Sequence, residues 1–446
     1  MANCAARWIA CVWAIRWTSA ESGVYQAPSN CPETGGFLPA TLITDLRSVA
    51  SLRPRDLEGP VLCANTFRSS AEAITLANNS RDALAASIWS ENINLALEVA
   101  QKVMAGVVWV NASHLSDAAA GVGGVRESGF GRHGGWEGAS TYTKPQHDTE
   151  PLTPVVLPVE DEDARPDRSI GHDAKFYIGG QQTRPGSDKT RAVFSVKGKL
   201  MGHVGCATEA DLCAAIAAAN AVKGWGDAPG LPRGRVLFEI GATLSQRGDE
   251  IARRLNRISG KKRGKAEVRA CVERLFTYSA WADKYDGQIH AVPIRGMALA
   301  VKQPVGVIGA FCPDEAPLLG MVSVMAPALA MGNSTVLVAS QSAPLAACDF
   351  FQILQASELP AGVVNVLTGE HAALADSMAG HMGLDAVWSF SSADLSGVIE
   401  RASASNLKRS WVNNARSRDW FGSAGQGRAF LDQACEVKNI WLPYGA

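Results

Sequence analysis

The sequence lacks three features that would each indicate a class of protein. Its ten cysteines form no CxxC pair and no CxxC…HxxxH spacing, which argues against a structural zinc site and a disulfide framework. No apolar run reaches the roughly 18 residues of a membrane span. Positive and negative charges cancel to a net charge of −1, which leaves no global field to attract nucleic acid. We therefore expect a cytoplasmic protein that binds no metal, nucleic acid or membrane.

The composition is that of a folded globular chain, with 47% hydrophobic and 19% charged residues. A chain of 446 residues can hold about three domains. We interpret the basic run over residues 253–265 as a solvated helical face. The apolar run at residues 8–15 leaves a secretory signal open, although Arg16 interrupts it and the cysteine pattern does not suit an exported protein.

The hydrophobic pattern predicts an α/β fold in two regions. Residues 35–145 alternate short strand and helix patterns and include a buried strand at 107–110. Residues 146–172 are rich in proline and acidic residues, which indicates a linker. Beyond them, continuously apolar strands are each followed by a helix, which predicts a doubly wound parallel sheet. These pairs are 305–311 with 317–331, 335–339 with 344–357, 363–367 with 372–379, and 386–390 with 393–405.

Several long strings resemble the aldehyde dehydrogenase family. APALAMGN (326–333) and LPAGVVNVLTG (359–369) resemble parts of its dinucleotide-binding domain. LAASIWSENINLALEVAQKVMAGVVWVN (84–111) and GGVRESGFGRHGGWEGASTYTKP (123–145) resemble its carboxyl-terminal portion. The resemblance implies an NAD(P)-dependent oxidoreductase fold, with a Rossmann-like domain and a partial α/β catalytic-domain remnant.

The two matched regions stand in the reverse of the family's order. This arrangement resembles aldehyde dehydrogenase family 16, whose members carry two units in tandem, the second incomplete; a circular permutant is the alternative. The tandem interpretation predicts a divergent segment (1–34), the tail of a first catalytic domain (35–145), a linker (146–172) and an incomplete cofactor-type domain (173–446). It also predicts a homo-oligomer, or packing against a companion aldehyde dehydrogenase unit.

No residue of this chain stands where the family has its nucleophilic cysteine. The stretch most similar to the family's Gly-Gln-x-Cys is 425–428, which has Arg428 at the cysteine position. We expect Cys312 and Cys435 to be inert, because a cysteine without a partnering base rarely reacts. The family's general-base glutamate is replaced by Asn413, and an amide cannot accept the proton.

The positions that resemble the family's substrate and cofactor contacts have also changed chemistry. Glu315 replaces the asparagine that donates to the oxyanion, and a carboxylate would repel that charge. Val338 and Gln341 replace the lysine and glutamate that hold the adenosine ribose. Ser391 replaces the glycine beside the pyrophosphate.

The remaining positions with a counterpart in the family are Ser392, Asp56 and Glu58. Ser392 follows Ser391 in the turn that faces the pyrophosphate. Asp56 keeps a carboxylate that could reach the nicotinamide ribose, and Glu58 replaces an aromatic residue beside the nicotinamide.

We therefore predict no catalytic residue and no bound cofactor in this chain, which would act as a structural or interaction unit. The alternative is a part of a longer NAD(P)-dependent aldehyde dehydrogenase whose active unit lies upstream. A nucleotide-sensing module that binds without turnover is the third hypothesis.

Overall fold

A computed structural model describes residues 24–26, 37–44, 59–143, 173–187, 189–195, 198–222, 224–259 and 262–444. The predicted linker (146–172) lies outside the described residues, as do Asp56 and Glu58.

A seven-stranded sheet forms the centre of the larger part of the molecule. Its five parallel strands run in the order β17-β16-β15-β18-β19, and the antiparallel pair β9 and β10 extends the β17 edge. The four central strands are buried along their whole length, as expected for a sheet covered on both faces. The predicted doubly wound sheet is confirmed. The strands are β9 (Phe176–Ile178), β10 (Gln181–Thr183), β15 (Val307–Phe311), β16 (Ser334–Val338), β17 (Val364–Leu367), β18 (Ala386–Ser389) and β19 (Arg409–Val412).

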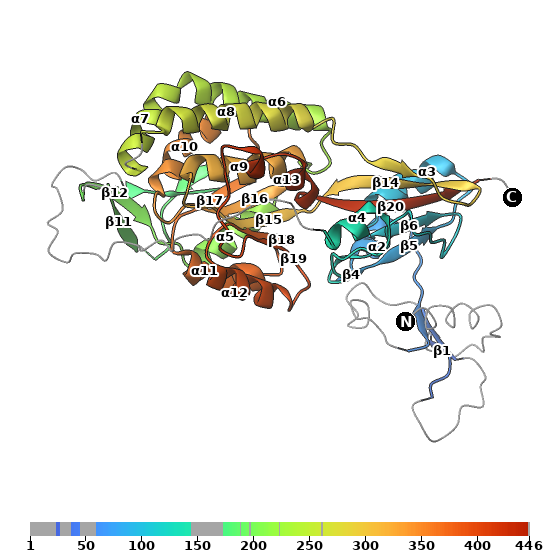
Figure 1. Ribbon diagram of the computed structural model, residues 1–446. Helices are drawn as coiled ribbons and strands as arrows, with labels where there is room; N and C mark the ends of the chain where they lie inside the picture. Colours follow the sequence, from blue (N-terminus) through green and yellow to red (C-terminus); the bar gives the residue numbers. More distant parts are fainter. Residues whose placement is uncertain are drawn as a thin grey trace.

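Helices cover both faces of this sheet (Figure 1). One face carries α6 (Gly230–Gln246), α7 (Gly248–Ser259), α8 (Gly264–Trp281), α9 (Pro317–Ala330) and α10 (Leu345–Gln355). The other carries α5 (Glu209–Asn220), α11 (His371–Gly380) and α12 (Ala393–Ser403).

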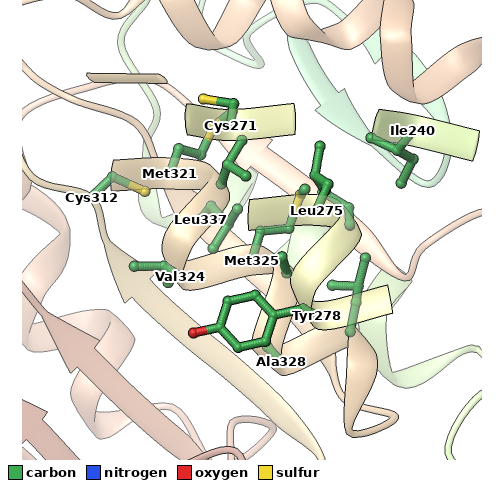
Figure 2. Close-up of a cluster of buried hydrophobic side chains, with 14 of the residues drawn as sticks. Ile240, Cys271, Leu275, Tyr278, Cys312, Met321, Val324, Met325, Ala328 and Leu337 are labelled. Carbon is green, nitrogen blue, oxygen red and sulfur yellow. The ribbon is translucent and has the colours of Figure 1, made fainter. Parts of the chain in front are cut away.

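The largest core cluster lies between α8, α9 and the sheet. Every residue of α9 is buried, because this helix packs against α8 on one side and the sheet on the other. Figure 2 shows Leu275 and Tyr278 of α8 beside Met325 and Ala328 of α9. A helix that is apolar all round is stable only in such a buried place.

A second sheet of five strands joins the two matched regions of the sequence. Its order is β13-β14-β20-β6-β5, and β6 pairs in parallel with β20 near the end of the chain. Thus β5 and β6 come from the first region and the other three strands from the second. The strands are β5 (Ala85–Ile88), β6 (Val107–Val110), β13 (Gln288–His290), β14 (Gly296–Pro304) and β20 (Cys435–Pro443).

Polar side chains of β20 complete this junction. The Nζ atom of Lys438, which is 3% exposed, donates to the carbonyls of Ala100 (3.3 Å), Gln101 (2.7 Å) and Val103 (2.6 Å) at the end of α3 (Ile93–Lys102). Asn439 donates to the carbonyl of Gly121 at 2.8 Å. The last carbonyls of a helix have no donor within the helix, so Lys438 of β20 supplies the donors that the end of α3 lacks.

Smaller elements complete the described part of the chain. They are the sheet β1 (Val24–Gln26), β2 (Thr41–Ile43) and β3 (Val61–Cys63); the pair β4 (Asp82–Ala83) and β7 (Val125–Arg126); the sheet β8 (Asp173–Ala174), β11 (Thr190–Phe194) and β12 (Leu200–Gly205); the helices α2 (Ser70–Asn78), α4 (Gly135–Thr141) and α13 (Arg428–Gln433); and a 3₁₀ turn at Ser423–Gly425.

Candidate functional site

The strand order places a candidate site between β15 and β18. The chain proceeds from β15 through β16 to β17 on one side, then returns to place β18 on the other side of β15. In open α/β sheets, ligands bind outside the carboxyl ends of the strands at such a reversal. Glu315 follows β15 here, and Ser391 and Ser392 follow β18, so the structure brings these three predicted positions to one edge.

Two of the predicted positions converge on a buried histidine. The backbone N–H of His371 donates to Oε1 of Gln341 at 2.9 Å. Its Nε2 lies 2.8 Å from the carbonyl of Ala339, which can only accept, so Nε2 carries the proton and Nδ1 accepts from the hydroxyl of Ser391 at 3.1 Å. Burial lowers the pKa of His371, which favours this neutral form. Gln341 and Ser391 are therefore engaged by the protein itself.

A second network involves Asp314, beside the predicted position Glu315. Oδ1 of Asp314 accepts from the hydroxyl of Ser340 at 2.5 Å, and from the backbone N–H and hydroxyl of Ser342 at 2.9 and 3.0 Å. The turn after β16 is thereby tied to the turn after β15. Burial raises the pKa of Glu315, and the charge of Asp314 adds to the rise.

The other predicted positions have structural roles. Val338 is fully buried and packs in the core cluster of the α5, α11 and α12 face. Ser392 is the N-cap of α12 and accepts from the N–H of Leu395 at 3.3 Å. Asn413 donates to the carbonyl of Arg416 at 3.1 Å, and its buried Oδ1 has no hydrogen-bond partner.

An aromatic cluster lies at the same edge, and it surrounds an arginine. Phe390 follows β18, Trp411 belongs to β19, and both contact Phe430 of α13. Trp420 completes the cluster, with its ring centroid 5.1 Å from that of Phe390. The guanidinium of Arg418 lies 5.2 to 5.9 Å from all four ring centroids. Burial lowers the pKa of Arg418, and the charge of Glu315 opposes that effect.

The N-terminus of α9 points to this edge and is bonded to a side chain of α8. Oε1 of Glu267, which is 5% exposed, accepts from the N–H groups of Leu318 at 2.9 Å and Leu319 at 3.2 Å. Helix N-termini carry unpaired donors and attract anions. Glu267 supplies the negative charge here from within the protein.

The thiols near the site are buried. Cys312 directly follows β15 and is fully buried, and burial raises its pKa well above the ordinary range. Burial also raises the pKa of Cys435 to about 12. Arg428, at the position that resembles the family's cysteine, lies over the ring of Tyr285 at 5.5 Å. A thiol that stays protonated is a poor nucleophile.

Four residues of this edge were missed in the sequence analysis: Asp314, His371, Glu267 and Arg418. Asp314 lies within the Pro-Asp-Glu-Ala-Pro turn and could have been suspected, because Ser340 and Ser342 follow the neighbouring strand. The partners of Glu267, and the rings of Phe390 and Phe430 beside Arg418, come from other elements and left no local signal. Among the residues that the structure describes, no cluster of metal-binding side chains is found. No helix in that same part of the chain could span a membrane.

Comparison with known proteins identifies the family. The model of the aldehyde dehydrogenase family matches residues 19–147 and 183–414, which is most of the chain. The chain belongs to the aldehyde dehydrogenase family. Relatives include an aldehyde dehydrogenase of Agaricus bisporus, 32% identical over 47% of this chain and 44% of that protein. Phenylacetaldehyde dehydrogenase of Pseudomonas fluorescens is 32% identical over 52% of this chain and 49% of that protein.

Solved structures agree with this family assignment. Apo betaine aldehyde dehydrogenase from Staphylococcus aureus (G234S mutant) superposes with a TM-score of 0.52 at 26% identity, over 54% of this chain and 49% of that one. The same enzyme in complex with NAD+ gives a TM-score of 0.51 at 26% identity, over the same shares of the two chains. The chain thus has an aldehyde-dehydrogenase-like α/β fold, and it spans about half the length of the relatives it matches.

Proposed function

We propose that this aldehyde dehydrogenase family chain is a catalytically inactive structural or interaction unit. The observation that carries the proposal is the filling of the sheet edge by the protein's own side chains. Arg418 and its four aromatic neighbours lie beside the reversal point, and His371 engages Gln341 and Ser391. A dinucleotide bound at this edge would have to displace both the Arg418 cluster and the hydrogen bonds of His371.

The side chains at the edge also do not fit the dinucleotide that the S. aureus enzyme holds in its complex. Val338 offers no hydrogen-bonding group to a ribose and lies in the core. Ser391 stands where the family has the glycine beside the pyrophosphate, and its hydroxyl is bonded to His371 at 3.1 Å. We therefore propose that this chain binds no NAD(P).

We further propose a family-16-like tandem arrangement in the cytoplasm, with residues 35–145 as the tail of one unit and residues 173–446 as an incomplete second unit. The exposed apolar residues beside the edge strand β5 suit packing against a second copy or a companion unit, because an open strand edge with apolar neighbours favours association. They are Leu84, Trp89 and Ile93, which are 55%, 68% and 50% exposed.

A titration with NADH tests the proposed inactivity, after light scattering has established a soluble and defined species. We expect no binding up to millimolar NADH, with an active aldehyde dehydrogenase as positive control. Micromolar binding, or steady NAD(P)-dependent oxidation of any aldehyde by the purified chain, would contradict the proposal.

A second candidate is a part of a longer NAD(P)-dependent enzyme that oxidises aldehydes to carboxylic acids. It is favoured by relatives that are named as aldehyde dehydrogenases and by their length, of which this chain covers about half. In that case, adding a complete upstream unit would produce NAD(P)-dependent oxidation that the present chain lacks. Deletion of residues 59–143 from the longer protein would then abolish that activity.

A further inference from the structure

The four aromatic rings around Arg418 form an enclosure of a kind that recognises cations. The guanidinium carbon lies 5.2 Å from the ring centroid of Phe390, 5.4 Å from those of Trp411 and Phe430, and 5.9 Å from that of Trp420. The rings of Trp411 and Trp420 stand nearly perpendicular to that of Phe390, at 84° and 83°. A cation within about 6 Å of an aromatic face is attracted by the ring quadrupole.

A guanidinium suits this enclosure better than an ammonium does. It is planar and weakly hydrated, so less free energy is needed to remove it from water. Arg418 also donates from one terminal nitrogen to the carbonyl of Ala424 at 2.8 Å, which fixes its orientation. Arg418 and Trp411 are half-buried, whereas the rings of Phe390, Trp420 and Phe430 are buried.

The enclosure connects three separate parts of the fold. Phe390 and Trp411 belong to the sheet edge, Phe430 belongs to α13, and Trp420 and Arg418 belong to the segment 413–427 between them. Arg274 of α8 holds the far side of this segment through the carbonyls of Trp420, at 2.9 Å, and Gly425. The segment is therefore attached on one side by Arg274 and on the other by Arg418.

We propose that Phe390, Trp411, Trp420 and Phe430 form a guanidinium-binding cage with Arg418 as its internal ligand. Occupancy of the cage holds the segment 413–427 closed over the carboxyl edge of the sheet. The segment 413–427 thus blocks this edge of the sheet from within the molecule. Small planar guanidinium compounds are the class of ligand that can take the place of the Arg418 side chain in the cage. This inference goes beyond the proposed function, because it concerns what holds the edge closed, whatever the protein binds.

Arg418→Ala tests the proposal, with Arg416→Ala as the matched control. Arg416 lies in the same segment but is exposed, and its side chain lies over none of the aromatic rings that the structure describes. Amide hydrogen exchange over residues 413–427 should accelerate about tenfold in R418A and stay unchanged in R416A. Guanidinium chloride at a few millimolar, far below denaturing concentrations, should restore slow exchange in R418A, whereas ammonium chloride should not.

Equal exchange in the two variants would overturn the proposal, as would rescue by both salts or by neither. If R418A does not fold, Arg418→Lys provides the test, because it keeps the charge and loses the planar group. We expect amide exchange in R418K to be faster than in the wild type and slower than that expected for an unoccupied cage. Guanidinium chloride should slow it in part. Wild-type exchange rates in R418K would overturn the cage as a guanidinium site.

Discussion

At the scale of single residues, the buried carboxylate of Glu267 should stabilise the start of α9. It accepts from two backbone N–H groups of α9 that have no alternative partner in the helix. We expect Glu267→Ala to lower the free energy of unfolding by about 2 to 4 kcal/mol, since two buried donors lose their acceptor. Urea denaturation followed by circular dichroism measures the change.

Glu273→Ala is the control on the same helix. Glu273 is exposed and, among the residues that the structure describes, its side chain pairs with Arg269 alone, at 2.8 Å, so its removal should change the free energy of unfolding by less than about 0.5 kcal/mol. Similar losses in the two variants would mean that Glu267 does not stabilise α9.

The chemistry of the single positions was predictable only in part. Side-chain type alone carries the predictions that Val338 offers no ribose contact and that Cys312 is inert, and the structure adds that both side chains are buried. The sequence was not sufficient to predict the cage around Arg418, because Phe390 follows β18, Trp411 lies in β19 and Phe430 lies in α13, and these rings meet only in three dimensions. Asp56 and Glu58 stay predictions.

At the scale of elements, local pattern predicted four of the five parallel strands, and the helices that follow them, to within a few residues, but not β19. The helix expected at residues 317–331 is Pro317–Ala330, and the strand expected at 107–110 is Val107–Val110. The pattern did not predict β14 or β20. These two strands pair with each other along nine residues, with more than a hundred residues between them, and a local pattern carries no information about such a partner.

The contact between β20 and α3 should make stability depend on pH. Burial lowers the pKa of Lys438 to about 8, whereas an unfolded lysine has a pKa of about 10.4. Between these values the unfolded chain binds more protons, so this residue makes stability rise as the pH rises. From pH 7.5 to pH 10, we expect the free energy of unfolding of the wild type to rise by about 2 kcal/mol relative to that of Lys438→Met. Urea denaturation at the two pH values measures this change.

The comparison with a variant is needed because other groups titrate in the same range. Lys102→Met is the control, since Lys102 lies at the same end of α3 and its side chain is 57% exposed. Relative to K102M, the wild type should show no such gain. If the difference in free energy of unfolding between wild type and K438M does not change with pH, the three carbonyls keep Lys438 charged.

At the scale of the whole molecule, the two regions should stay together without a covalent link. A protease site inserted into the linker 146–172 and then cut should give two fragments that elute together near the 47.1 kDa of the intact chain, if it is monomeric. The ladder between β6 and β20 and the bonds of Lys438 and Asn439 provide the attachment. Size-exclusion chromatography with light scattering measures the mass of the cut species.

Trp441→Ala should weaken this association. Trp441 pairs with Trp109 across the junction and is 1% exposed, and loss of a buried tryptophan costs about 4 kcal/mol. Trp136→Ala, at a position that is 70% exposed, should leave the fragments associated. Separation of the wild-type fragments after cleavage would contradict the junction as the attachment.

The position of β20 at the end of the chain also has a consequence for synthesis on the ribosome. Lys438 and its partner Val103 are 335 residues apart. At about 5 to 20 residues per second, β6 emerges roughly 20 to 70 s before the strand that completes its sheet. During that time the nascent first region exposes apolar surface to chaperones and proteases. Translation that stops between β6 and β20 should leave this surface uncovered, because the strand that pairs with β6 has not been made.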